Sequence, residues 1–77
     1  MSVSANEELD ARGMNCPLPV LKTKKTIDGM AAGQILKVIA TDPGSVNDMD
    51  SWARRTGNEI VEREENDGEF VYFIKKK

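Results

Sequence analysis

The chain has 77 residues, enough for one domain with a modest core and too few for a catalytic domain around a deep, enclosed cleft. Hydrophobic residues make up 39% of the chain, and no apolar run approaches the roughly 20 residues of a membrane-spanning helix. The net charge of -2 argues against a broad basic surface, so we expect no direct binding to nucleic acid or membrane. Residues 1–77 are therefore predicted to form a single domain.

The first predicted element is a short strand over Asn6 to Asp10, followed by a loop that leads to the only cysteine, Cys16. Pro17 has the fixed backbone angle of a first helical position, where its missing N–H costs nothing. We therefore expect a helix to open directly after Cys16.

That first helix is predicted to be amphipathic. With about 100° per residue, one side of it collects the residues Val20, Thr23, Ile27, Met30 and Ala31. Lys22 and Lys25 fall on the opposite side. Leu18 falls on the outer side near Cys16, where a leucine has no core to fill, which makes it a candidate contact residue.

A central strand is predicted next, because Ile35 to Ala40 is a nearly continuous apolar run. A turn follows, in which either Asp42 or Ser45 could cap a second helix from about Val46 to Thr56. Gly57 stands where a helix commonly ends.

The chain closes with a predicted hairpin, made of strands Glu59 to Glu65 and Glu69 to Lys75 around the turn Asn66-Asp67-Gly68. The predicted order is β-α-β-α-β-β. This order indicates an α+β fold, a two-layer α/β sandwich with a four-stranded mixed sheet and two helices on one face. The three lysines at the end of the chain, Lys75 to Lys77, are typical of a solvated tail.

Cys16 is the residue that carries chemistry in this sequence. At a helix entrance, free backbone N–H groups and the positive end of the helix dipole stabilise a thiolate. Pro17 and Pro19 stiffen this entrance, and Arg12 in the preceding loop, beside Gly13, is a candidate source of nearby positive charge. These features favour a reactive thiol over a buried structural one.

Several familiar thiol chemistries lack their partners here. The chain has no histidine, so a Cys-His protease pair is excluded, and with one cysteine there is no thioredoxin-type exchange within the chain. One cysteine without histidine is also too few ligands for a tight zinc or iron–sulfur site, so we expect neither a metal nor a cofactor.

The pattern Leu9-Asp10-x-x-Gly13-Met14-x-Cys16-Pro17-x-Pro19 resembles the signature of the TusA (SirA-like) family of sulfur carriers. The similarity continues at Gly33-Gln34, Thr41-Asp42-Pro43 and Gly57-Asn58-Glu59. The resemblance implies that Cys16 accepts sulfane sulfur as a persulfide from a cysteine desulfurase or a rhodanese. It also implies a DsrE-type (TusBCD-like) acceptor that leads to tRNA 2-thiolation, molybdenum cofactor assembly or cytoplasmic sulfur oxidation.

Under this interpretation the protein is a sulfurtransferase-type carrier more than a stand-alone enzyme, and we expect it to be a monomer. Candidate partner contacts are Leu18, Lys22 and Lys25. Residues 1–8 lack the basic start and apolar stretch of a secretory signal, so a cytoplasmic location is expected.

Two alternatives stay open: a non-catalytic adaptor or regulatory module that docks partners through the Pro17 and Leu18 surface, and a redox sensor that forms disulfides between molecules.

Overall fold

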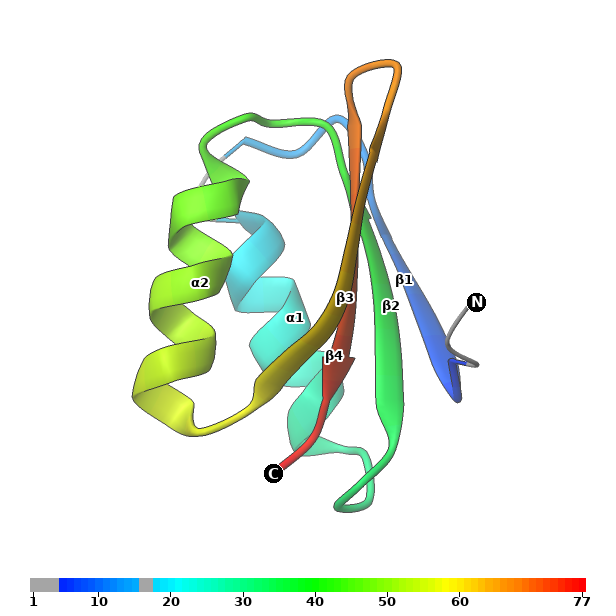
Figure 1. The fold of residues 1–77 in the computed structure, drawn as a ribbon, viewed down its shortest axis with the longest axis vertical. Helices are drawn as coiled ribbons and strands as arrows, with labels where there is room; N and C mark the ends of the chain where they lie inside the picture. Colours follow the sequence, from blue (N-terminus) through cyan, green and yellow to red (C-terminus); the bar gives the residue numbers. More distant parts are fainter. Residues whose placement is uncertain (1–4, 16–17) are drawn as a thin grey trace.

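The computed structural model describes residues 5–15 and 18–77, so Cys16 and Pro17 lie outside the described residues. The elements are β1 (Glu7–Ala11), α1 (Leu18–Asp28), β2 (Ile35–Ala40), α2 (Ser45–Thr56), β3 (Glu59–Asn66) and β4 (Glu69–Lys75). Both helices lie on one side of a four-stranded sheet (Figure 1). The predicted α+β sandwich, with its order and its mixed sheet, is confirmed.

The strands lie in the order β1-β2-β4-β3. Strands β1 and β2 are parallel, with Ala11 opposite Ala40, and the helix α1 makes the crossover between them. Strand β4 pairs antiparallel with both β2 and β3. This order places β2 and β4 in the centre and leaves β1 and β3 as the two edges.

The core lies between the helices and the sheet. Strand β2 has alternating burial, and its Leu36, Val38 and Ala40 are fully buried, because successive side chains point to opposite faces of a sheet. The other core residues include Ile27 from α1, Met49, Trp52 and Ala53 from α2, and Tyr72 and Ile74 from β4.

The face of the sheet without helices is not bare. Val71 and Phe73 alternate with the core residues of β4 and are nevertheless only 8% and 6% exposed. The Lys37 ammonium lies 5.9 Å from the centre of the Phe73 ring, within the range of a cation–π contact. Neighbouring side chains, and not a further layer of structure, therefore cover this face.

The hairpin turn follows the prediction. Asp67 and Gly68 have φ angles of 48° and 80°, the two positive values that a type I′ turn requires between antiparallel strands. Near its start, strand β3 has a bulge between Ile60 and Glu62, where its register against β4 shifts by one residue.

Two sequence-based expectations about α1 and the end of the chain were wrong. The helix ends at Asp28, so Ala31 is exposed and not part of a buried helix face, although Met30 is still buried. The terminal lysines are not a solvated tail, because the backbone of Lys76 hydrogen-bonds with Gly33 and Gln34. The Nζ of Lys76 also donates to the carbonyl of Met30 at 2.8 Å.

The start of α2 resolves the two capping candidates. Neither candidate is the cap residue, because Gly44 occupies that position and no side chain caps the helix there. The Asp42 carboxylate accepts the N–H of Gly44 at 3.0 Å and so shapes the turn before the helix. Ser45 is buried as the first helical residue. Neither α1 nor α2 is long and apolar enough to cross a membrane.

Candidate functional site

The loop before Cys16 leaves the sheet beside the loop that opens α2. Because β1 and β2 are parallel, the segments that follow them start at the same end of the sheet. Figure 1 shows these two loops and the first turns of both helices at one end of the molecule. In the sequence, Cys16 follows Asn15 and stands two positions before Leu18, the first residue of α1.

A hydrogen bond joins the two loops. The N–H of Gly13 donates to the Thr41 hydroxyl at 2.9 Å, across 28 positions of the chain. Gly13 has a φ of 80°, which disfavours any residue with a side chain, although no atom lies within 4 Å of where its Cβ would be. The backbone conformation of the turn, and not a lack of space, therefore explains the glycine.

The charge of Arg12 is engaged by two carboxylates. Its guanidinium forms two hydrogen bonds of 3.0 Å with Asp10 and lies 3.5 Å from the carboxylate of Glu69. The hydrogen bonds from Arg12 lower the pKa of Asp10 to about 2 and, in return, raise the pKa of Arg12. Among the described residues, then, Arg12 secures the loop to the end of the sheet.

Hydrogen bonds and burial hold the first turn of α1 in place. The N–H of Leu18 donates to the carbonyl of Asn15 at 2.9 Å, which joins the loop to the helix. Pro19 is buried, and its carbonyl accepts the Thr23 hydroxyl at 2.7 Å. Pro19 therefore packs inside the protein. Pro17 lies outside the described residues.

The outer side of α1 carries an exposed apolar and basic stripe. Leu18 and Leu21 are 49% and 55% exposed, and Lys22 and Lys25 are exposed as well. Spacings of three, four and seven residues place all four side chains on one side of a helix. We call these four residues the α1 outer stripe. Leu21 was not among the predicted contact residues, although its distance of three residues from Leu18 was a signal that would have found it.

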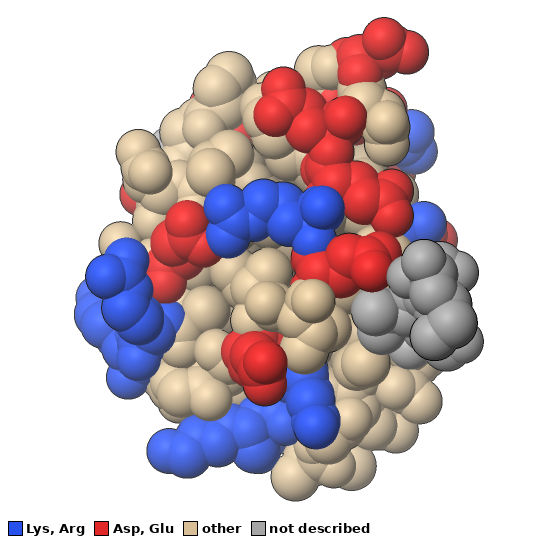
Figure 2. Space-filling view, in the orientation of Figure 1, with Lys and Arg blue, Asp and Glu red and all other residues tan. Residues whose placement is uncertain are grey.

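Charged side chains are unevenly distributed over the surface. On the face seen in Figure 2, acidic side chains gather toward the β3–β4 hairpin, and basic ones lie beside α2 and toward the C-terminal end. The hairpin strands contain Glu62, Glu64, Glu65 and Glu69. In residues 5–15 and 18–77, no group of three or more His, Cys, Asp or Glu side chains is suited to hold a metal ion.

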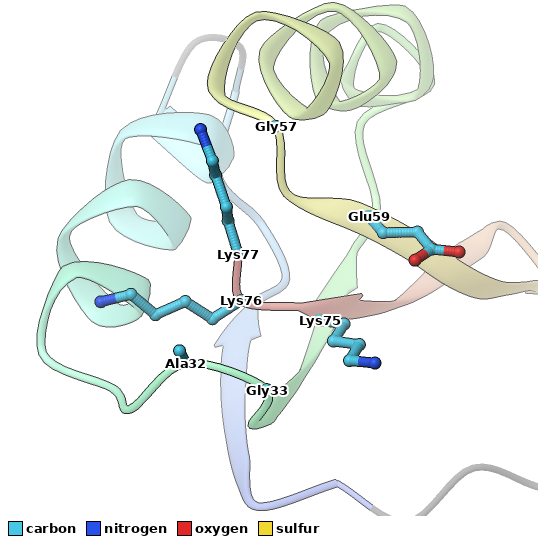
Figure 3. Close-up of a pocket in the computed structure, with 7 residues that line it drawn as sticks. All are labelled: Ala32, Gly33, Gly57, Glu59, Lys75, Lys76 and Lys77. Atoms are coloured by element: carbon cyan, nitrogen blue, oxygen red, sulfur yellow. The ribbon is translucent and has the colours of Figure 1, made fainter.

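An open pocket of about 420 Å³ lies at the other end of the sheet, lined by Ala32, Gly33, Gly57, Glu59, Lys75, Lys76 and Lys77. Figure 3 shows the three lysine side chains pointing in different directions. Lys76 is bonded to the end of α1, and the side chain of Lys77 lies over Gly57. The pocket therefore does not gather the lysines around one ligand. It also lies away from the loop over residues 12–15.

Comparison with known proteins supplies the context for these features. Residues 7–76 match the family described as Sulfurtransferase TusA. The chain is 58% identical to the "Sulfur carrier protein TusA" of Allochromatium vinosum, over 92% of this chain and 93% of that protein. It is 49% identical to a "Putative sulfur carrier protein" of Halobacterium salinarum, over 91% of this chain and 88% of the relative.

A solved structure agrees with the fold. The crystal structure of a SirA-like protein from Desulfitobacterium hafniense superposes with a TM-score of 0.78 at 28% sequence identity. The match covers 90% of this chain and 95% of the other.

Proposed function

Because the chain belongs to the TusA family of sulfur carriers, we propose that it carries sulfane sulfur as a persulfide on Cys16 and relays it to partner proteins. The family match over residues 7–76 is the observation that carries this proposal. The chain holds one cysteine and no histidine, so a single thiol has to do the chemistry. We propose that residues 1–77 form one domain, and that the protein acts as a carrier in the cytoplasm.

The proposed transfer is an exchange between sulfur atoms. The Cys16 thiolate attacks the terminal sulfur of a donor persulfide, a new S–S bond forms, and the donor's S–S bond breaks. The donor leaves as a thiolate, so no external oxidant or reductant is consumed. In the second step, an acceptor thiolate attacks the sulfur bound to Cys16 and restores the free thiol.

The surroundings of Cys16 in the chain support a presented thiol. Gly13 and Arg12 hold the preceding loop through Thr41, Asp10 and Glu69, and the helix α1 begins two residues after Cys16. A free thiol next to the first turn of a helix gains thiolate character from unpaired N–H groups and from the helix dipole. A loop that is already ordered lowers the entropic cost of presenting one sulfur atom to a partner.

We propose that donor and acceptor proteins contact the α1 outer stripe. Leu18 and Leu21 offer apolar area that no core residue covers, and Lys22 and Lys25 add positive charge along the same side. Such a surface fits a partner with an apolar recess and acidic residues at its rim. The proposed donor is a cysteine desulfurase or a rhodanese, and the proposed acceptor is a DsrE-type protein.

The intact mass of the protein tests the carrier function directly. After incubation with a persulfide donor, the wild-type chain should gain one sulfur atom, which a reductant removes. The Cys16→Ser variant should gain none. Absence of the adduct with both a desulfurase and a rhodanese donor would contradict the proposal.

The same variant separates a carrier from an adaptor. Under the adaptor hypothesis, Cys16→Ser keeps both partner binding and biological activity, because the sulfur atom has no role. Under the carrier hypothesis, binding persists while sulfur transfer is lost. Binding is measured by titration calorimetry, and transfer by following a sulfur label from donor to acceptor.

A further inference from the structure

We infer that Thr41 is a positioning residue for sulfur transfer, which holds the loop from Arg12 to Asn15 and thereby the thiol that follows it. This inference rests on the proposed function of Cys16. Thr41 comes directly after the central strand β2, so its backbone is anchored in the most buried part of the sheet. Its hydroxyl accepts the N–H of Gly13 at 2.9 Å.

Among the hydrogen bonds and ion pairs of the described residues, Thr41 and Glu69 are the distant residues that bond to this loop, and Met14 of the loop also packs against the core. The contact of Glu69 with Arg12 is an ion pair of 3.5 Å between side chains that are 41% and 51% exposed. Pairs as exposed as this contribute little, because water and salt screen them. Thr41 is half-buried and accepts a hydrogen bond from the backbone itself, so it acts directly on the path of the loop, whereas the ion pair acts through the long side chain of Arg12.

The position of Thr41 also connects the two helix entrances. The next residue, Asp42, shapes the turn that opens α2 through its bond to Gly44. A two-residue segment after β2 therefore binds the loop before α1 and forms the loop before α2. If Thr41 loses its acceptor, the Gly13 N–H must find water, and the loop is free to move relative to the sheet.

The test compares Thr41→Val, which keeps the shape and removes the acceptor, with Thr41→Ser, which keeps the hydroxyl. Hydrogen exchange at the Gly13 amide reports the bond directly. It should be about fivefold faster in the valine variant, the factor that one hydrogen bond of ordinary strength contributes. The serine variant should exchange at the wild-type rate.

Alkylation by iodoacetamide then reports on the thiol, since the chain has a single cysteine. The valine variant should react about two- to fivefold more slowly at pH 7, where reactivity depends on how well the helix start stabilises the thiolate. At pH 10, where a thiol is mostly ionised in any surroundings, its rate should equal that of the wild type. A merely structural role would leave this dependence on pH unchanged.

Sulfur uptake from a persulfide donor should slow in parallel in the valine variant. Unchanged Gly13 exchange, or an alkylation profile that coincides with or exceeds the wild-type one at pH 7, overturns the inference. If the wild-type protein takes up sulfur and the valine variant matches it in exchange and alkylation, only the proposed role of Thr41 is contradicted. If the wild-type protein takes up no sulfur, the carrier function is contradicted, and alkylation and exchange still decide whether Thr41 positions the thiol.

Discussion

The hydroxyl groups of Ser45 and Tyr72 lie 3.0 Å apart and share a hydrogen bond between the first turn of α2 and the central strand β4. Both residues are fully buried. Burial raises the pKa of Tyr72 above its ordinary value of 10.0, so its hydroxyl is protonated at neutral pH. The bond fixes the start of α2 above the sheet, next to the loop that carries Thr41.

This bond predicts non-additive mutational effects. Tyr72→Phe and Ser45→Ala should each lower the free energy of unfolding by about 1–3 kcal/mol, because each leaves a buried hydroxyl without its partner. The double variant should cost less than the sum of the two, since both polar groups are then gone. Urea unfolding of the four proteins measures this, and strictly additive effects would contradict the coupling.

The Asp10 carboxyl is predicted to titrate at pH about 2, below its ordinary 3.8, because Arg12 bonds to its charged form. A lowered pKa in the folded state stabilises the protein above pH 3.8, and this contribution disappears as the pH falls through about 2. Carbon-detected NMR titration of Asp10 checks the value. In Arg12→Ala the midpoint should return toward the ordinary one, and an unchanged midpoint would exclude Arg12 as the cause.

The α1 outer stripe predicts a binding defect without a folding defect. Leu21→Ser should raise the KM for sulfur transfer from the donor by about tenfold, the loss of about 1.4 kcal/mol expected for one good apolar contact in an interface. The melting temperature should stay unchanged, because Leu21 is 55% exposed. Val61→Ser on β3, where the side chain is 36% exposed, is the matched control and should leave KM unaltered. Equal KM values in both variants would refute the contact.

Lys76 is predicted to stabilise the end of α1. Its Nζ donates to the carbonyl of Met30 at 2.8 Å and lies 3.4 Å from that of Asp28. Lys76→Met should therefore lower the free energy of unfolding by about 0.5–1.5 kcal/mol. Lys75→Met, at the exposed end of β4, should have almost no effect. Thermal unfolding compares them, and equal losses would contradict the assigned role.

Most of the fold was predictable because the local signals agree with one another. The apolar run from Ile35 to Ala40 and the turn Asn66-Asp67-Gly68 each specify their element through backbone and side-chain preferences alone. The error at Ala31 arose because a periodic pattern carries no information about where the helix stops. In the structure α1 ends at Asp28, and Met30 reaches the core from the following turn.

The sequence predicted which residues belong to the candidate site, but it did not predict the contacts between them. The motif around Cys16 identified the loop, and helical spacing placed Leu18 outside the core. The bond between Gly13 and Thr41 spans 28 positions and depends on β1 and β2 lying side by side in parallel. Likewise, the pairing of Arg12 with Glu69 is decided by the sheet, since Glu69 begins a strand that lies far from the loop in the sequence, whereas its pairing with Asp10 is local.

The bulged edge strand β3 is poorly suited to pairing with a second copy of the protein. Four of its eight residues are glutamates, Glu59, Glu62, Glu64 and Glu65, and the bulge at Ile60 and Glu62 twists the edge out of register. A second copy that tried to extend the sheet there would bring like charges together across mismatched backbones. The β3 edge therefore resists extension of the sheet from one copy to the next, which suits the proposed role of a carrier that diffuses between partners.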